Sequence, residues 1–195
     1  MVHQRISIYF SFIIVFFSLL PSAFAQEYKF NLQVLQGGKI IKPNELVYHL
    51  KSKPISLQIE ANNLNGFLVG ATFDEDVYKS ALGVADLEVN WFEETGMAEE
   101  LFNSDKSMFV SNDAPSYWYY ISKDDHRFDK DPKSTNSGWV GVKTINSLYD
   151  IVNGSDIDLK SFKKSIYLFI YKPYYNNEHE LENKDVLFHA ELRFK

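Results

Sequence analysis

The sequence predicts an all-β fold, and its C-terminal part supports this most clearly. Residues 165–171 are apolar or aromatic on both faces, which is typical of a strand in the middle of a sheet or beneath a cover. Residues 186–194 alternate instead, as a strand with one buried face does. The side chains expected to share that buried face are Val186, Phe188, Ala190, Leu192 and Phe194.

The rest of the chain repeats this pattern of short strands. Turn signals recur every ten residues or so along the chain, and no long amphipathic helix interrupts them. A strand that is apolar on both faces suits a covered sheet. We therefore predict an antiparallel two-sheet sandwich with one or two short helices, and a barrel is the alternative.

The N-terminal stretch has the three parts of a secretory signal peptide. Arg5 supplies a positive charge, residues 6–20 are almost entirely apolar, and residues 21–25 end in an Ala-x-Ala cleavage pattern. The apolar part is shorter than the about 20 residues that a membrane-spanning helix needs. We expect residues 1–25 to be removed, leaving residues 26–195 as a single exported domain without a transmembrane anchor. A bacterial periplasm or the extracellular space is favoured over a eukaryotic secretory route.

Composition excludes several kinds of chemistry. The 195-residue chain has no cysteine, so disulfides, thiolate catalysis and cysteine-based metal sites are all absent. Its formal net charge of −6 argues against nucleic acid as a partner, and also against docking on anionic lipid head groups.

The first half of the chain reads mostly as strands. Residues 29–36 alternate, and Gly37-Gly38 predicts a tight turn into a return strand at residues 39–41, which residues 46–48 are expected to resume. Strands are also predicted at residues 55–60 and 67–73, where Gly70 marks a bulge or a close approach of backbone.

Beyond residue 74 the pattern is weaker. Residues 76–83 predict a helix of one or two turns, and residues 95–102 a second short helix. The remaining expected strands are residues 87–92, 107–111, 116–122 and 138–142, whereas residues 145–158 remain unassigned. Residues 123–137 are polar and are predicted to be a long exposed loop. Residues 172–185 are predicted to be a polar crossing, which connects the two C-terminal strands.

The densest aromatic run lies in the strand predicted at residues 116–122. Tyr117 and Tyr119 would point to one face and Trp118 and Tyr120 to the other, so one pair can fill the core while the other is exposed. Exposed tyrosine and tryptophan rings stack on sugars or anchor protein partners, but both pairs are more often covered in a strand this rich in aromatic residues. The candidate binding residues are Tyr117, Trp118, Tyr119, Tyr120, His126, Phe128, Trp139, Tyr174 and Tyr175.

No motif supports a metal, a cofactor or a catalytic residue. Arg127 and Lys130 interrupt the acidic residues 124–131, which also lack the glycine of a calcium loop. Residues 179–183 begin like a zinc helix but carry Asn183 where a second histidine is needed. A nucleophile elbow is absent, and a pair of glycosidase carboxylates is compatible with almost any chain this acidic.

These observations favour a non-enzymatic exported domain that binds a protein, such as an inhibitor, an immunity-type protein or an envelope accessory factor. The alternative is a carbohydrate-binding module or carbohydrate-active enzyme that uses Trp118, Tyr120 and Trp139. The exposure of these rings discriminates between the two, because buried rings cannot stack on a sugar.

Overall fold

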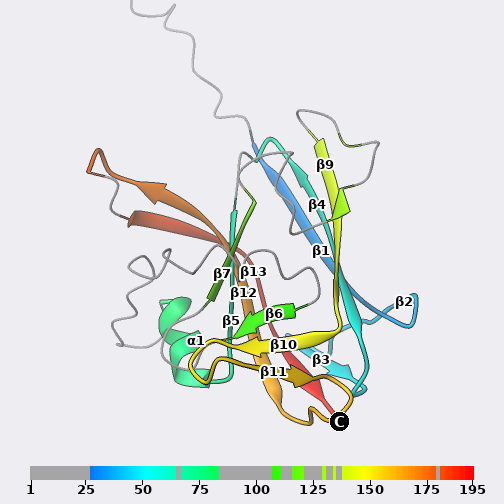
Figure 1. Cartoon of the computed structure of the whole chain (residues 1–195). Helices are drawn as coiled ribbons and strands as arrows, with labels where there is room; N and C mark the ends of the chain where they lie inside the picture. Colours follow the sequence, from blue (N-terminus) through cyan, green and yellow to red (C-terminus); the bar gives the residue numbers. More distant parts are fainter. Residues whose placement is uncertain are drawn as a thin grey trace, which may run out of the picture.

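The computed structural model describes residues 27–64, 67–83, 107–110, 116–120, 129–130, 134, 138–178 and 181–195. At residues 107, 116–120, 129–130 and 181 it describes the backbone alone. The described residues form three β-sheets and one helix (Figure 1).

The first sheet has five strands, and every neighbouring pair in it is antiparallel. Positive φ angles of 59° at Gly37 and 74° at Gly38 make the tight turn that the sequence predicts. In spatial order the strands are β2 (Lys39–Ile40), β1 (Lys29–Gln36), β4 (Ile55–Asn62), β9 (Gly138–Ile145) and β8 (Asp129–Lys130).

The second sheet also has five strands and is organised around the C-terminal pair. In spatial order they are β3 (Val47–Leu50), β13 (Leu181–Phe194), β12 (Ser165–Tyr175), β5 (Phe67–Thr72) and β7 (Ser116–Tyr120). The sequence predicted that residues 46–48 resume the hairpin of the first sheet. Instead, β3 pairs in parallel with β13 of the second sheet. Asn44 and Val47 exchange two backbone hydrogen bonds around Glu45, which has a positive φ of 55°, and this local turn redirects the chain.

A third, three-stranded sheet runs across the lower part of the molecule (Figure 1). It takes up residues that the sequence left unassigned, and β10 pairs in parallel with β6. Its strands are β11 (Ser155–Asp158), β10 (Ser147–Asp150) and β6 (Ser107–Val110).

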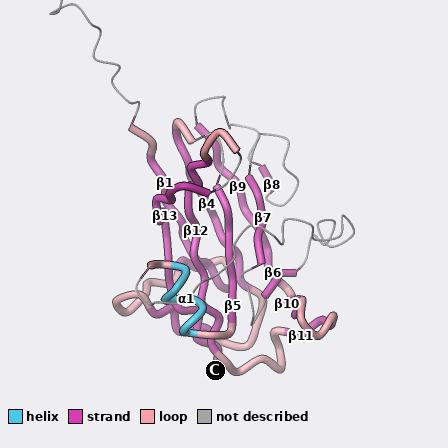
Figure 2. Tube along the Cα trace, turned by 90° about the vertical axis from the view of Figure 1, so that its left-hand side faces the viewer, coloured by secondary structure: helices cyan, strands magenta, loops and turns pink. Residues whose placement is uncertain are grey.

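The main core lies between the facing sides of the two larger sheets, whose strands run along the long axis of the molecule (Figure 2). Alternating residues supply it, as in other sandwiches. Each described sheet is open, so the fold is an all-β sandwich with a short helix and not a closed barrel. The fully buried core side chains include Val34, Leu57, Ile59, Ile145, Ile166, Leu168, Ile170 and Leu192.

The one described helix, α1 (Glu75–Ala81), covers the outer side of the second sheet and forms a second, smaller core with it. Asp74 caps the helix, because its side chain accepts hydrogen bonds from the backbone N–H groups of Asp76 and Val77. The buried residues of this core are Leu68, Ala81, Phe169 and Tyr171. β12 is therefore buried on both faces, which confirms the sequence prediction for residues 165–171.

Gly70 is the point at which β5 approaches the ring of Phe169 most closely. The two residues are directly opposite each other in the β5–β12 pair. A Cβ atom added at Gly70 would lie 2.0 Å from Cε2 of Phe169. The close approach predicted at this glycine is thus real, and the aromatic ring of the neighbouring strand fills the missing volume.

Some predicted elements lie outside the described residues: the signal peptide at 1–25, the strand at 87–92 and the second helix at 95–102. Within the described part of the chain, no helix has the length and apolar character needed to span a bilayer.

We expect Gly70→Ala to destabilise the protein by about 1–3 kcal/mol, because the added methyl group must displace a packed ring. Urea unfolding followed by tryptophan fluorescence measures this change. In a Phe169→Leu background the same substitution should cost clearly less, since the obstructing ring is gone. Equal costs in the two backgrounds would show that the Phe169 ring does not fill this space.

Candidate functional site

The most distinctive feature of the structure is a two-stranded arm that projects from the second sheet (Figure 1). β12 pairs with β5 only as far as Tyr171, and β13 pairs with β3 only from Glu191 onward. Beyond these points the two strands pair with each other. We call residues 172–178 and 181–186 the arm. The sequence analysis predicted a polar crossing here, but the strands continue through most of it.

A β-bulge at Leu187 separates the arm from the sheet. Ile170 is opposite Phe188, whereas Tyr171 is opposite Val186, so Leu187 is the extra residue. A bulge shifts the alternation of a strand by one position. Val186 therefore leaves the buried face that the sequence assigned to it, and its side chain is 40% exposed.

The face of the arm that continues the inner side of the sheet carries a cluster of four residues, which we call the tyrosine latch: Tyr28, Lys172, Tyr174 and Asp185. Tyr28 precedes β1, and Lys172 and Asp185 are directly opposite each other on the arm. The hydroxyl groups of Tyr28 and Tyr174 both donate to Oδ2 of Asp185, at 2.6 Å and 2.5 Å. Nζ of Lys172 lies 4.7 Å and 4.6 Å from the centroids of the two tyrosine rings.

Electrostatics reinforce the latch. The hydrogen bonds from Tyr174 and Tyr28 lower the pKa of Asp185 below its ordinary 3.8, because they stabilise the carboxylate. The hydrogen bond to Asp185 raises the pKa of Tyr28 to about 12. The folded state thus holds the phenol proton more tightly than the unfolded chain does. The raised pKa of Tyr28 therefore contributes to the stability of the fold, fully below pH 10, and this contribution is lost as the pH rises toward 12.

The opposite face of the arm forms a hydrogen bond with the helix. Nζ of Lys184 donates to the backbone carbonyl of Ala81 in the last turn of α1. A cation at this end of a helix satisfies carbonyls that have no partner within the helix. Burial lowers the pKa of Lys184. The arm is therefore held at its base from both sides, by Tyr28 on one and by α1 on the other.

Next to the latch lies an open hollow of about 470 Å³, lined by Tyr174, Glu182, Asn183 and Asp185. Its chemistry is an aromatic ring beside carboxylates and an amide. Such groups could hydrogen-bond a polar ligand, and the ring offers a surface for stacking. Asp185 already accepts hydrogen bonds from two phenols, however, so its carboxylate can accept fewer hydrogen bonds from a ligand.

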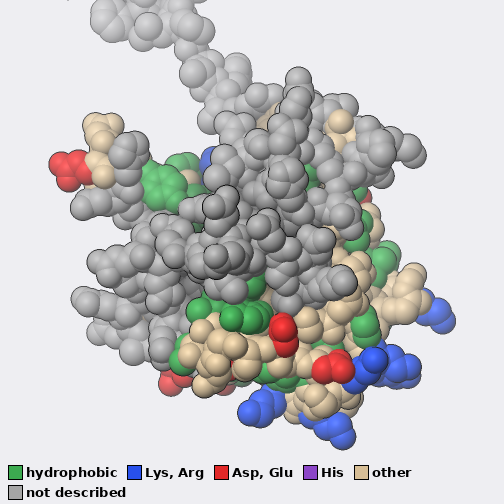
Figure 3. Space-filling view, in the orientation of Figure 1, with side chains coloured by type: hydrophobic (Ala, Val, Ile, Leu, Met, Phe, Trp, Pro, Cys, Tyr) green, Lys and Arg blue, Asp and Glu red, His purple; other side chains and the backbone are tan. Residues whose placement is uncertain are grey.

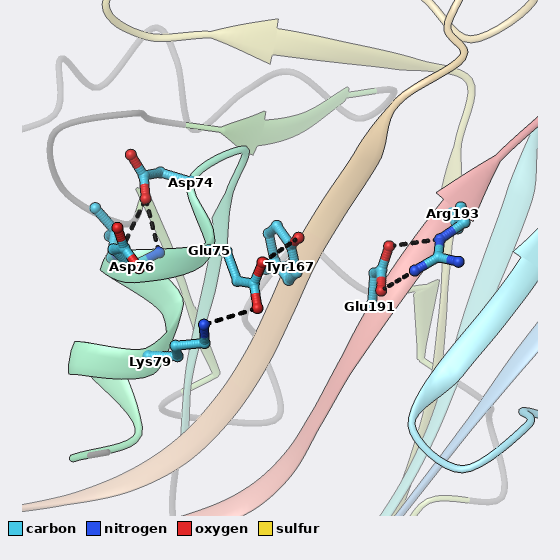
Figure 4. A network of polar contacts seen from close by, with 8 residues as sticks. Asp74, Glu75, Asp76, Lys79, Tyr167, Glu191 and Arg193 are labelled. Atoms are coloured by element: carbon cyan, nitrogen blue, oxygen red, sulfur yellow. Dashed lines mark hydrogen bonds and ion pairs between the residues drawn. The ribbon is translucent and has the colours of Figure 1, made fainter. Parts of the chain in front are cut away.

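A polar network lies on the outer side of the second sheet, between α1 and the C-terminal strands (Figure 4). Arg193 donates to both carboxylate oxygens of Glu191 at 2.8 Å, and the hydroxyl of Ser165 donates to Oε1 of the same carboxylate. On the helix, Lys79 forms an ion pair with Glu75 at 2.8 Å.

This network does not have the geometry of a serine-hydrolase triad. The hydroxyl of Ser165 is bonded directly to a carboxylate, and Nδ1 of His189 lies 2.8 Å from the hydroxyl of Tyr78. A serine hydrolase needs the histidine between the serine and the acid. Burial, with a smaller effect of Glu191, raises the pKa of Tyr78 to about 12, so its phenol stays protonated at neutral pH. The described residues include no group of three side chains suited to holding a metal ion.

Of the three predicted binding residues whose side chains the structure describes, two lie on the arm. Tyr174 belongs to the latch, and Tyr175 is 43% exposed on the arm. The side chains of Tyr117, Trp118, Tyr119 and Tyr120 lie outside the description, although their backbone forms β7. His126 and Phe128 also lie outside the described residues. Within the predicted loop at 123–137, two residues form the strand β8. The hydroxyl of Ser134 hydrogen-bonds the N–H and the carbonyl of Val140.

Trp139 does not extend a surface of exposed rings, as the sequence analysis expected. Its side chain is only 6% exposed and packs against Phe67, with 5.9 Å between the ring centroids. Trp139 lies on β9 opposite Ala61 of β4, and both residues contribute to the main core. Its position in the first sheet therefore buries the ring.

Sequence reasoning missed Tyr28, Lys172 and Asp185 as members of a site. Lys172 and Tyr174 are two residues apart, as are Asn183 and Asp185, so each pair shares a strand face. This spacing was a usable signal for the arm. Nothing in the sequence indicates that Tyr28 reaches the same face from the other end of the chain.

Comparison with known proteins finds no matching family, no similar curated protein and no similar solved structure.

We expect Asp185→Asn to lower the free energy of unfolding by about 1 kcal/mol at neutral pH, because two charge-assisted hydrogen bonds become neutral ones. The lowered pKa of Asp185 means that this contribution is present above pH 3.8 and is lost as the pH falls further. Urea unfolding at a series of pH values should therefore show the two proteins converging in acid. Asp156→Asn, an exposed carboxylate on β11, is the matched control and should leave stability nearly unchanged at every pH. A constant difference between Asp185→Asn and the native protein down to about pH 3 would contradict the latch.

Proposed function

We propose that this chain is an exported, non-enzymatic domain that binds another protein, and that the arm makes the contact. The observation that supports this most directly is the combination of exposed apolar side chains with an ordered backbone. Among the described residues, only five large apolar side chains are exposed, and Tyr175 and Val186 of the arm are two of them.

The exposed apolar residues lie on one face of the arm. Pro173 and Tyr175 follow the alternation of β12, and Val186 is opposite Tyr171, a buried residue on the same face. An apolar strip with a tyrosine is a typical anchor in protein interfaces, since tyrosine combines a large contact area with few rotatable bonds. Pro173 has no backbone N–H and weakens that edge as a template for another strand. Side chains rather than strand addition are therefore expected to make the contact on the β12 side.

The tyrosine latch supports the same function, because it orders the arm before a partner arrives. A two-stranded hairpin alone is only marginally stable in water. Here Tyr28 and α1 hold the two faces of its base. A surface ordered in advance loses less conformational entropy on binding, so more of the contact energy appears as affinity.

The state of the carboxylates also favours binding over catalysis. A general acid in a glycosidase needs a raised pKa, whereas the pKa of Asp185 is lowered. Glu191, the carboxylate bonded to Ser165, likewise has a lowered pKa, mainly because Arg193 donates to it. Both groups are held as bound anions and act as hydrogen-bond acceptors that order the surface.

A second candidate function is carbohydrate binding in the hollow beside the latch. The tyrosine ring, amide and carboxylates of that hollow are groups that bind sugars. One of the rings proposed to stack on a sugar, Trp139, is buried in the core and cannot do so. We therefore rank it below protein binding.

The test is a pull-down from an extract of the cell envelope of the source cells, with the protein as bait. We expect one partner to be recovered reproducibly and then to bind in purified form. A double variant, Tyr175→Ser with Val186→Ser, should weaken this purified complex about tenfold or more, because it removes the apolar anchors. The control is Ile40→Ser with Val152→Ser, which removes two equally exposed apolar side chains outside the arm. Thermal unfolding of both variants verifies that each is folded.

Two outcomes would contradict the proposal. Equal loss of binding in both double variants would place the contact elsewhere than on the arm. Capture of no protein, together with retention on a polysaccharide column that Asn183→Ala abolishes, would favour the carbohydrate function instead.

A further inference from the structure

Five lysines gather at the end of the sandwich where the C-terminus lies. They come from two short stretches with no acidic residue, Lys-Ser-Lys at positions 51–53 and Lys-Ser-Phe-Lys-Lys at positions 160–164. All five side chains are exposed. Figure 3 shows Lys and Arg side chains collected around this lower end of the molecule. We call this surface the lysine pole: Lys51, Lys53, Lys160, Lys163 and Lys164.

Ser52 joins the two stretches, which are more than a hundred residues apart in the sequence. Its hydroxyl lies 2.6 Å from the carbonyl of Phe162 and 3.1 Å from that of Lys195. The backbone N–H of Phe194 donates to the carbonyl of Lys164 at 3.0 Å. Three segments of chain are thus held together by the Ser52 hydroxyl and backbone groups, and the lysine side chains take no part in these bonds.

The backbone beneath the lysines is well fixed. The side-chain amide of Gln36 donates to the carbonyls of Lys51 and Lys53, and its oxygen accepts from the N–H of Lys51. The buried rings of Phe162 and Phe194 pack edge to face below, with centroids 5.5 Å apart. The positive charges therefore stand on a rigid base and keep their own rotational freedom.

The ammonium groups of the pole are not held in ion pairs within the described part of the chain, although acidic side chains also lie at this end of the molecule (Figure 3). None of the five ammonium groups forms an ion pair there, since the described ion pairs join Lys79 to Glu75 and Arg193 to Glu191. The nearest carboxylate in sequence, Asp158, accepts the backbone N–H of Lys160 at 2.9 Å and so caps a turn. A fixed concentration of positive charge on an acidic protein calls for an anionic partner.

The form of the pole indicates which anionic partner fits. Lysine is a hydrated point charge on a flexible stem, whereas recognition of individual carboxylates or phosphates generally uses the planar fork of arginine. Binding of a nucleic acid strand also uses exposed rings for stacking, but Phe162 and Phe194 are buried here. Flexible point charges above buried rings match a diffuse negative surface.

We propose that the lysine pole docks the domain on a bilayer that contains anionic lipid, through the phosphates of the head groups. The negative net charge of the whole chain does not prevent this, because charges beyond about 10 Å are largely screened at physiological salt. Only the end that meets the bilayer contributes strongly. The arm projects from the opposite end of the second sheet (Figure 1), so docking leaves it accessible, and the two sites are independent.

Vesicle co-sedimentation tests the proposal, with the exported protein recovered from cells and its N-terminus verified by mass spectrometry. We expect binding to vesicles of phosphatidylcholine with phosphatidylglycerol, little binding to phosphatidylcholine alone, and a decline with added salt. Each lysine near an anionic surface contributes about fivefold to partitioning, so Lys53→Gln with Lys164→Gln should weaken binding by about twentyfold or more. The control, Lys29→Gln with Lys79→Gln, removes the same charge elsewhere and should bind nearly as the native protein does.

Three results would overturn the proposal. The first is equal binding to both kinds of vesicle, and the second is equal loss of binding in the two double variants. The third is indifference to vesicles with salt-sensitive retention on immobilised poly-glutamate, which would assign the pole to an acidic protein.

Discussion

The pairing of β12 with β13 is the constraint on which the rest of the structure depends. β12 contributes to both cores, with Ile166, Leu168 and Ile170 on the inner side and Phe169 and Tyr171 beneath α1. β13 continues the inner core and carries β3 at its far edge. Removing β12 would expose both apolar faces at once, and β13 extends the strand pair into the arm, so this pair couples the sandwich, the helix and the arm.

The bulge at Leu187 marks the point where the β12–β13 pair leaves the sheet and continues as the arm. On the sheet side of the bulge the alternation packs the partly buried Phe188 against the main core, and on the other side it turns Val186 outward. The strands then continue as the arm, which needs other support because no further strand of the described chain flanks it. Tyr28 and Lys184 provide that support from opposite faces. Core formation and presentation of the arm thus follow from a single strand register.

Much of the fold could be predicted from alternation of apolar residues. The strands at residues 29–36, 55–60 and 165–171 have clear patterns and the short helix after residue 74 a weaker one, and the structure confirms all four. The arm could not be recognised in the same way, because a hairpin exposed on both faces has polar side chains and resembles a loop. The outward turn of Val186 follows from a bulge, which alternation does not reveal. The partner of β3 and the burial of Trp139 depend on contacts between distant segments, which one sequence does not specify.

The candidate sites show the same limit. Tyr174 and Tyr175 were found as aromatic residues, but the bond that Tyr174 shares with Tyr28 at Asp185 depends on the folded structure. The net charge of −6 argued against an anionic surface as partner, whereas the fold collects lysines from two distant stretches at one end. Net charge describes the whole chain, and binding depends on the charge that one face presents.

The central claim is that the arm is ordered in the free protein by its contacts with Tyr28 and α1. Hydrogen exchange of the backbone amides, read by mass spectrometry on the protein alone, tests it most directly. The account predicts slowed exchange in residues 172–175 and 182–186, and a marked loss of that protection in Tyr28→Phe, while residues 166–170 stay protected in both. Exchange in the arm at the rate of an unstructured peptide, in the native protein, would contradict it.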